Sequence, residues 1–161
     1  MKNQLLLILF LMLVNIAFSQ KFSHKVNSEE GKFNLAFPVK PVIEKNETDG
    51  INTAMYLGQL EKKVFLFSYT LVQESPVGQA EILETALKAF TESTAIEVKT
   101  KREIKKGKTT GLYGEGSSKS GLHVAYEVYF QNNILYQIGV MSEEKIESKA
   151  MKSFSKTLII K

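Results

Sequence analysis

The segment KKGKTTGLYGEG, residues 105–116, contains glycine, lysine and threonine in the order used by phosphate-binding loops. Such a loop reads G-x-x-x-x-G-K-[ST], and its glycine-rich backbone wraps the phosphates just before a helix begins. The first glycine of that pattern is replaced by Arg102, and the residues after Thr109 are β-branched, aromatic and broken by glycine. We therefore interpret Gly107-Lys108-Thr109 as a hairpin turn. The glycines of the strand that follows predict a bulge or a closely packed neighbour.

Other catalytic patterns are equally incomplete. The two histidines are His24 and His123, and Glu127 is predicted to share a strand face with His123. A metal or acid–base role for that pair is the alternative to a plain surface histidine. Two segments beginning at Ser142 and Ser153 match S-x-x-K, but the companion motifs S-D-N and K-T-G are absent. The chain has no cysteine and therefore no thiolate ligand or nucleophile. We predict no enzyme and no cofactor, and a hydrolase with an unrecognised site is the alternative.

Six of the ten residues from 99 to 108 are cations, opposed only by Glu103. The lysines at odd positions are predicted to lie on the strand face opposite Ile96, Val98 and Ile104. A solvated face that protects an edge strand explains this pattern. The alternative is a surface for an anionic partner such as a lipid surface, a polysaccharide or an acidic protein. The residues of that candidate surface are Lys99, Lys101, Lys105 and Lys108. The net charge of +4 is mild and does not predict nucleic-acid binding.

Apolar residues recur with period two over most of the chain, which is typical of strands that bury one face. These runs cover residues 33–37, 51–57, 65–71, 96–104, 122–130 and 134–140. The pairs Asp49-Gly50, Lys106-Gly107 and Asn132-Asn133 accept positive φ, as tight hairpins require. Strands that follow one another in the sequence are therefore expected to pair in an antiparallel manner.

Two segments change to the helical period. Gln79–Ser93 carries one apolar stripe, and Ser142–Thr157 repeats apolar residues every four positions, with Ser142 as the expected N-cap. Several strands, a helix, four strands and a second helix indicate an α+β fold. We predict a twisted antiparallel sheet of about six to eight strands, connected by meander hairpins and flanked by two helices.

The N-terminus predicts export. Lys2 precedes an unbroken apolar run from Leu5 to Val14, and Ala17 and Ser19 are small residues at the positions that signal peptidase requires. This run is shorter than the ~20 residues of a spanning helix. We predict that residues 1–19 are a signal peptide cleaved after Ser19. Residues 20–161 would then form a single domain in the periplasm or outside the cell, without a transmembrane segment.

Several segments resemble the PsbP-like and DcrB-like group of small exported proteins. GKFNLAFP at residues 31–38 is similar to the opening strand of the group, and YFQNNILY at residues 129–136 is similar to its hairpin between aromatic residues. Residues 107–115 resemble its glycine-containing middle strand, and residues 151–159 resemble its closing helix. The resemblance implies an antiparallel sheet flanked by helices, non-enzymatic accessory, assembly or binding roles, and no catalytic residues.

These observations favour a non-enzymatic accessory or binding protein whose partner is another exported protein or an anionic surface. The alternative is a carrier of a small apolar ligand between the sheet and the helix at residues 79–93, lined by Phe65, Phe67 and Tyr69. A pocket of several hundred Å³ would favour the carrier. The sequence leaves the oligomeric state open.

Overall fold

The computed structural model describes residues 21–48, 50–73, 77–146 and 148–161. The predicted signal peptide lies outside this part of the chain. The first strands are β1 (His24–Ser28), β2 (Phe33–Phe37), β3 (Val42–Thr48), β4 (Ile51–Leu60) and β5 (Lys63–Leu71). Helix α2 (Gln79–Ser93) follows. The remaining elements are β6 (Ile96–Lys106), β7 (Thr109–Ser118), β8 (His123–Gln131), β9 (Ile134–Ser142), helix α3 (Ser148–Lys156) and β10 (Ile159–Ile160).

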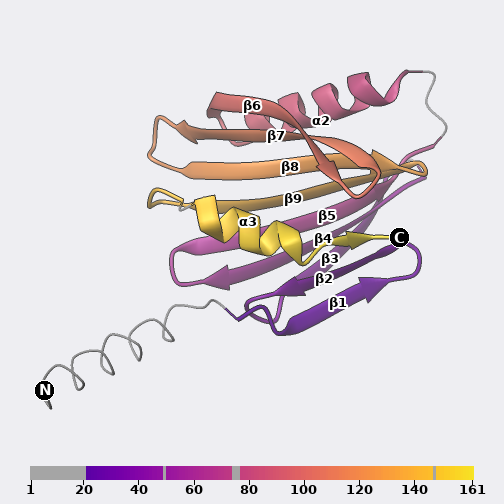
Figure 1. Ribbon diagram of the computed structural model, residues 1–161, viewed down its shortest axis with the longest axis horizontal. Helices are drawn as coiled ribbons and strands as arrows, with labels where there is room; N and C mark the ends of the chain where they lie inside the picture. The colour runs from indigo at the N-terminus through magenta and orange to yellow at the C-terminus, as the bar shows by residue number, and fades with distance from the viewer. Residues whose placement is uncertain (1–20, 49, 74–76, 147) are drawn as a thin grey trace, which may run out of the picture.

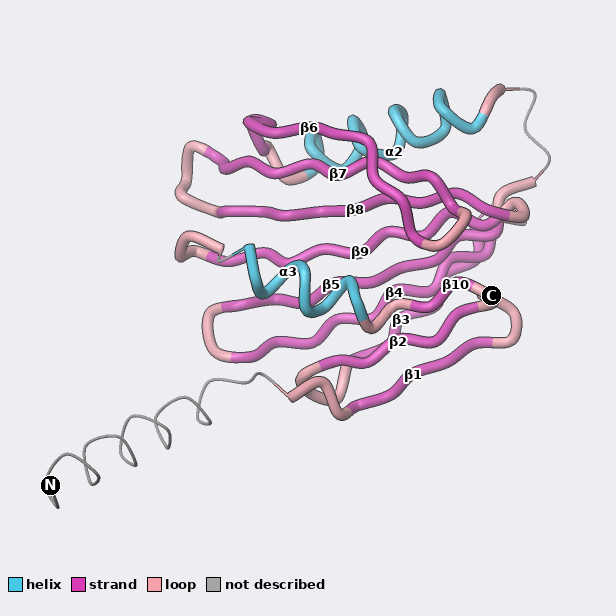
Figure 2. The backbone as a smooth tube through the Cα atoms, in the orientation of Figure 1, coloured by secondary structure: helices cyan, strands magenta, loops and turns pink. Residues whose placement is uncertain are grey.

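Seven strands form one antiparallel sheet in the order β3-β4-β5-β9-β8-β7-β6. A smaller sheet contains β1, β2 and β10, with β2 in the centre. Figure 1 shows α3 and the small sheet on one face of the large sheet, with α2 at its β6 end, and Figure 2 shows the same layers by element type. The predicted α+β architecture with an antiparallel sheet and two helices is confirmed. The separate small sheet was not predicted.

The main core fills the space between the large sheet, the small sheet and α3. It is rich in aromatic rings because strands β2 and β5 and helix α3 all contribute phenylalanine to it. Phe33, Phe37, Phe65, Phe67 and Phe154 are all fully buried there. A second, smaller core lies on the other face of the large sheet, between helix α2 and strands β6, β7 and β8. Leu83 and Leu87 of the helix are buried there.

The hairpin turns follow the sequence. Asn132 and Asn133, between β8 and β9, have φ of 52° and 57°, and Gly107, between β6 and β7, has φ of 61°. Gly114 of β7 leaves room for α2, because a Cβ atom there would come within 2.8 Å of Leu87. These observations confirm the predicted turns at Gly107 and at Asn132-Asn133 and the predicted close packing at a strand glycine, whereas Asp49 of the third predicted turn lies outside the described residues.

The start of the second helix differs from the prediction. Helix α2 spans Gln79–Ser93 as expected, but α3 begins at Ser148 rather than at Ser142. Ser142 is the last residue of β9, and its Oγ accepts a hydrogen bond from the backbone N–H of Glu144. The serine therefore organises the turn after the strand and is no helix cap. Strands β1, β3 and β10 were also missed, because they are short or fully exposed.

None of the helices in the described ranges is both long enough and apolar enough to cross a membrane.

Candidate functional site

An open hollow lies on the α2 face of the large sheet, beside the helix. Helix α2 packs on β6, β7 and β8, and so leaves that face of β3, β4, β5 and β9 without a helix over it. The hollow has a volume of about 360 Å³ and is open to solvent. We call it the α2 groove. Its lining residues are Glu44, Asn46, Thr53, Met55, Leu57, Leu66, Ser68, Phe90, Thr94, Gln137 and Met141.

The α2 groove corrects the predicted orientation of β4. The apolar row of Ile51, Met55 and Leu57 was expected to be the buried face of its strand. In the structure Ile51 is 42% exposed, and the side chains buried from β4 are Ala54 and Tyr56 on the opposite face. The row of β4 that contains Met55 and Leu57 therefore forms a wall of the groove. It keeps apolar side chains at a surface that no other part of the described chain covers.

The floor of the α2 groove follows one cross-strand row. Met55 of β4 lies opposite Ser68 of β5, and Ser68 lies opposite Gln137 of β9. Glu44 of the edge strand β3 lies opposite Met55 and completes the row at the rim. The neighbouring row contributes Leu57 and Leu66. Polar groups thus occupy the middle of the floor, and apolar side chains flank them.

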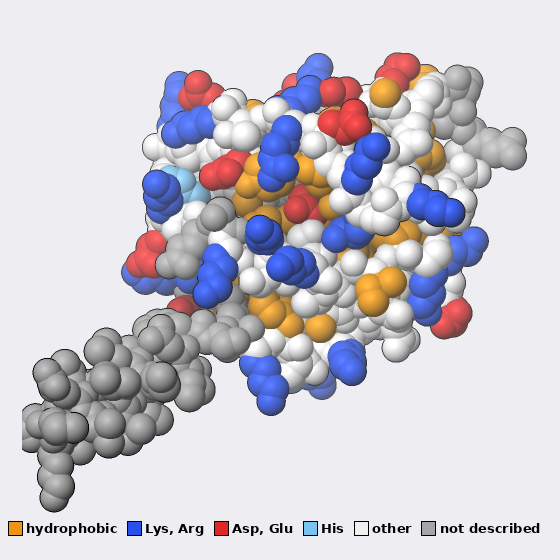
Figure 3. Space-filling model, in the orientation of Figure 1, with side chains coloured by type: hydrophobic (Ala, Val, Ile, Leu, Met, Phe, Trp, Pro, Cys, Tyr) orange, Lys and Arg blue, Asp and Glu red, His pale blue; other side chains and the backbone are white. Residues whose placement is uncertain are grey.

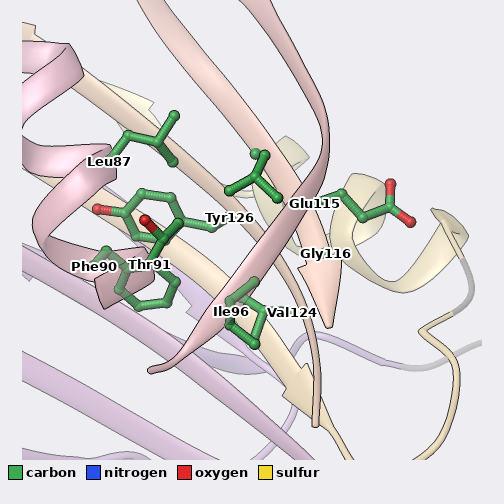
Figure 4. Close-up of a pocket in the computed structure, with 10 residues that line it drawn as sticks. Leu87, Phe90, Thr91, Ile96, Glu115, Gly116, Val124 and Tyr126 are labelled. Carbon is green, nitrogen blue, oxygen red and sulfur yellow. The ribbon is translucent and has the colours of Figure 1, made fainter. Parts of the chain in front are cut away.

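The space directly beneath α2 is filled. The ring of Phe90 stacks on Tyr126 at a centroid separation of 3.9 Å and an interplanar angle of 9°. The cavity that remains there measures about 10 Å³, which is room for a single water molecule at most. Figure 4 shows Leu87 and Phe90 directed at Tyr126, while Glu115 points away from the cavity. A ligand therefore has room beside the helix and not under it.

The residues that were expected to line a ligand pocket under α2 lie on the other face of the large sheet. Phe65, Phe67 and Tyr69 point to the α3 face and are buried in the main core. The alternating pattern of β5 was recognised correctly, but the helix that covers this row is α3, together with the small sheet, and not α2. The predicted lining of the carrier pocket is wrong.

A buried polar network ties α3 to the sheet on the opposite face. Glu127 is buried, and its Oε2 accepts hydrogen bonds from Tyr129 Oη at 2.6 Å and Ser155 Oγ at 2.5 Å. Lys106 Nζ donates to the backbone carbonyl oxygen of Ser155 at 2.8 Å and to its Oγ at 3.1 Å. Burial lowers the pKa of Lys106, and the negative charge of Glu127 partly offsets this effect.

This network bears on the alternative that His123 and Glu127 form a metal or acid–base pair. Glu127 accepts hydrogen bonds from the hydroxyls of Tyr129 and Ser155. His123 is the half-buried first residue of β8, and Glu127 lies in the buried middle of the same strand. Across the described residues, no three His, Asp or Glu side chains gather in a way that could hold a metal ion. The role that the contacts support for Glu127 is the docking of α3 on the sheet.

The lysine surface is exposed, but its geometry differs from the prediction. The pairing of β6 with β7 shifts between Val98 and Thr100, so that Lys99 sits in a bulge. After the bulge Lys101 and Lys105 lie on the same face as Ile96 and Val98, whereas Ile104 joins the main core on the other face. The predicted separation of lysines and apolar residues onto opposite faces is therefore wrong.

The four candidate lysines also have different surroundings. Lys101 forms an ion pair with Glu84 of α2, which reduces the charge it can offer to a partner. Lys108 lies in the turn after β6, next to Gly107. Figure 3 shows the α3 face, where Lys and Arg side chains are spread widely over the surface and do not gather in one patch.

The segment that resembles a phosphate loop is a hairpin turn. Gly107 and Lys108 connect β6 to β7, and Thr109 is the first residue of a strand, with no helix after it. Thr109 is buried, and its hydroxyl donates to Gln131 of the neighbouring strand β8. The interpretation of this segment as a turn is confirmed.

The sequence matches no known family model and no curated protein. The structure is similar to the solution structure of cyanobacterial PsbP (CyanoP) from Synechocystis sp. PCC 6803, with a TM-score of 0.60. The similarity covers 86% of this chain and 92% of that chain at 6% sequence identity. At this identity the likeness shows the fold alone, which is PsbP-like. Membership of the DcrB-like group stays a prediction from the sequence.

Proposed function

We propose that the protein is an exported, non-enzymatic binding protein that holds a small ligand with an apolar body in the α2 groove. The observation that carries the proposal is the open hollow of about 360 Å³, which is within the usual size of small-molecule sites. Its apolar walls can remove a hydrocarbon surface from water, and its few polar side chains can orient a ligand. Export rests on the apolar run from Leu5 to Val14 and on the small residues Ala17 and Ser19.

A dye titration tests the proposal. We expect the neutral dye N-phenyl-1-naphthylamine to bind saturably, with one dye per chain and an increase in its fluorescence. Met55→Arg places a charge in the wall of the groove, and we expect it to weaken binding at least tenfold because dye binding would then bury a cation against an apolar ring. The side chain of Met55 is only partly buried, so the fold should tolerate the change.

Ile43→Arg is the matched control. Ile43 lies on the neighbouring strand, is 51% exposed and faces the opposite side of the sheet. This variant should bind the dye as the wild type does. Equal loss of binding in both variants, or unsaturable binding to the wild type, would contradict the proposed site.

A second candidate function is docking on an anionic partner through Lys99, Lys101, Lys105 and Lys108. It is favoured by the exposure of all four side chains on or beside an edge strand. Binding to an anionic polymer should weaken steeply between 0.1 M and 1 M salt, because the Debye length falls from ~10 Å to ~3 Å. We expect Lys101→Ala to have the smallest effect of the four single variants, since Lys101 is already paired with Glu84. Four equal effects would contradict this ranking.

A further inference from the structure

The floor of the α2 groove contains the hydroxyl group of Ser68. Ser68 is 7% exposed and lines the groove, and its Oγ has no hydrogen-bond partner among the described residues. No fully buried side-chain nitrogen or oxygen of the described residues lacks a hydrogen-bond partner, so the hydroxyl of Ser68 is open to the groove and free to meet a ligand. The residue on the opposite strand, Gln137, is also only partly satisfied. The Oε1 atom of Gln137 accepts a hydrogen bond from the hydroxyl of Tyr126, and its Nε2 atom donates no hydrogen bond to another described residue.

Together these two side chains form a polar subsite. Ser68 and Gln137 are directly opposed in an antiparallel pair, which places their Cβ atoms ~5 Å apart. The amide of Gln137 can donate a hydrogen bond, and the hydroxyl of Ser68 can donate or accept one. A single oxygen of an alcohol or an amide can therefore receive bonds from both. Leu66 and Met141 beside them offer apolar contact for the rest of such a molecule.

The charges around the α2 groove restrict the ligand further. No lysine, arginine or histidine belongs to its lining, and its one ionisable side chain is the carboxylate of Glu44 at the exposed rim. An anionic ligand would find no cation to compensate its loss of hydration. Glu44 is two strands away from Ser68, so the two backbones are ~10 Å apart. At that distance the carboxylate repels an anion in the subsite and attracts a cation.

We infer that the α2 groove selects a single-chain amphiphile whose polar group is uncharged or cationic, and that it rejects carboxylates. The inference rests on the proposed function, because it names the ligand class of the same groove. Ser68 and Gln137 hold the polar group, and the apolar walls hold the chain. Glu44 sets the preference between charges of opposite sign.

Competition against the bound dye tests the inference with three ligands of equal chain length, namely decan-1-ol, decylamine and decanoate, below their micellar concentrations. In low salt we expect decanol to displace the dye about tenfold more effectively than decanoate, and decylamine to displace it more effectively than decanol. The first ratio is the order expected for the repulsion of one like charge ~10 Å away near a protein surface, and the cation gains an attraction in addition. Glu44→Lys should reverse the order of decylamine and decanoate while leaving decanol unchanged.

Ser68→Ala gives a second readout. It keeps the shape of the floor and removes the hydroxyl, so decanol should bind several-fold more weakly while the uncharged dye binds as before. Displacement by decanoate as effective as that by decylamine would overturn the inference and leave the groove itself in place. Absence of any binding, by the dye and all three ligands, would overturn the proposed function as well.

Discussion

Phe154 is the point at which α3 is anchored to the rest of the molecule, and its removal can be worked through from the contacts. Its side chain is fully buried. The ring lies 5.0 Å from that of Phe37 and 5.2 Å from that of Phe65, both edge-to-face, and 5.9 Å from that of Phe22, to which it is stacked. Phe154→Ala removes apolar surface and leaves a cavity bounded by three rings from different parts of the chain.

Substitutions of this kind cost about 3–5 kcal/mol, and the three aromatic contacts place this one toward the upper part of that range. The loss is a large fraction of the 5–15 kcal/mol that stabilises an ordinary domain. Urea unfolding followed by circular dichroism measures it, with Phe154→Leu as the control that refills most of the cavity and should cost clearly less. A decrease below ~1 kcal/mol for Phe154→Ala, with an unchanged slope against urea, would refute the docking of α3 described above.

Three further outcomes are expected. Mass spectrometry of exported material should show a chain that begins at Gln20, and a protein that retains Leu5–Val14 would contradict export by cleavage. Lys108→Ala should change the free energy of unfolding by less than ~0.5 kcal/mol, because the residue is exposed in a turn, and the wild type should show no magnesium-dependent thermal shift with ATP. Burial raises the pKa of Tyr136 to about 12 and also raises that of Tyr126. Stability should therefore be complete below pH 10 and decrease as the pH rises toward 12, together with the phenolate absorbance at 295 nm. Phenolate that forms near pH 10 without unfolding would contradict this.

The sequence predicted well where a local pattern decides the structure. The helix at residues 79–93 has the correct bounds because its apolar stripe is a local signal. The turn at Asn132-Asn133 was recognised because both residues accept positive φ. The burial of Phe65, Phe67 and Tyr69 follows from period two alone.

The candidate site could not be predicted in the same way, because it depends on which element covers which face. Both rows of β4 and β5 contain apolar residues, and the sequence does not say that α2 covers only the β6–β8 half of its face. The row containing Met55 and Leu57 was therefore expected to be buried. The bulge at Lys99 was equally hidden, because one extra residue inverts the alternation of all that follow it. A polar Ser68 within an apolar strand was the one local sign of the groove floor.

The two edges of the large sheet differ in their ability to accept another strand. At one edge β6 is bulged at Lys99 and rich in lysine, and both properties oppose pairing with a further chain. At the other edge β3 pairs with β4 over seven consecutive residues without a bulge, and it exposes Val42 and Ile43. Of these two edges, β3 is therefore the one suited to pairing with a strand of another copy. When two copies join there, both outer edges of the combined sheet are β6 strands, and growth ends at the dimer. The bulge and the lysines of β6 thus oppose the growth of such a sheet into a fibre.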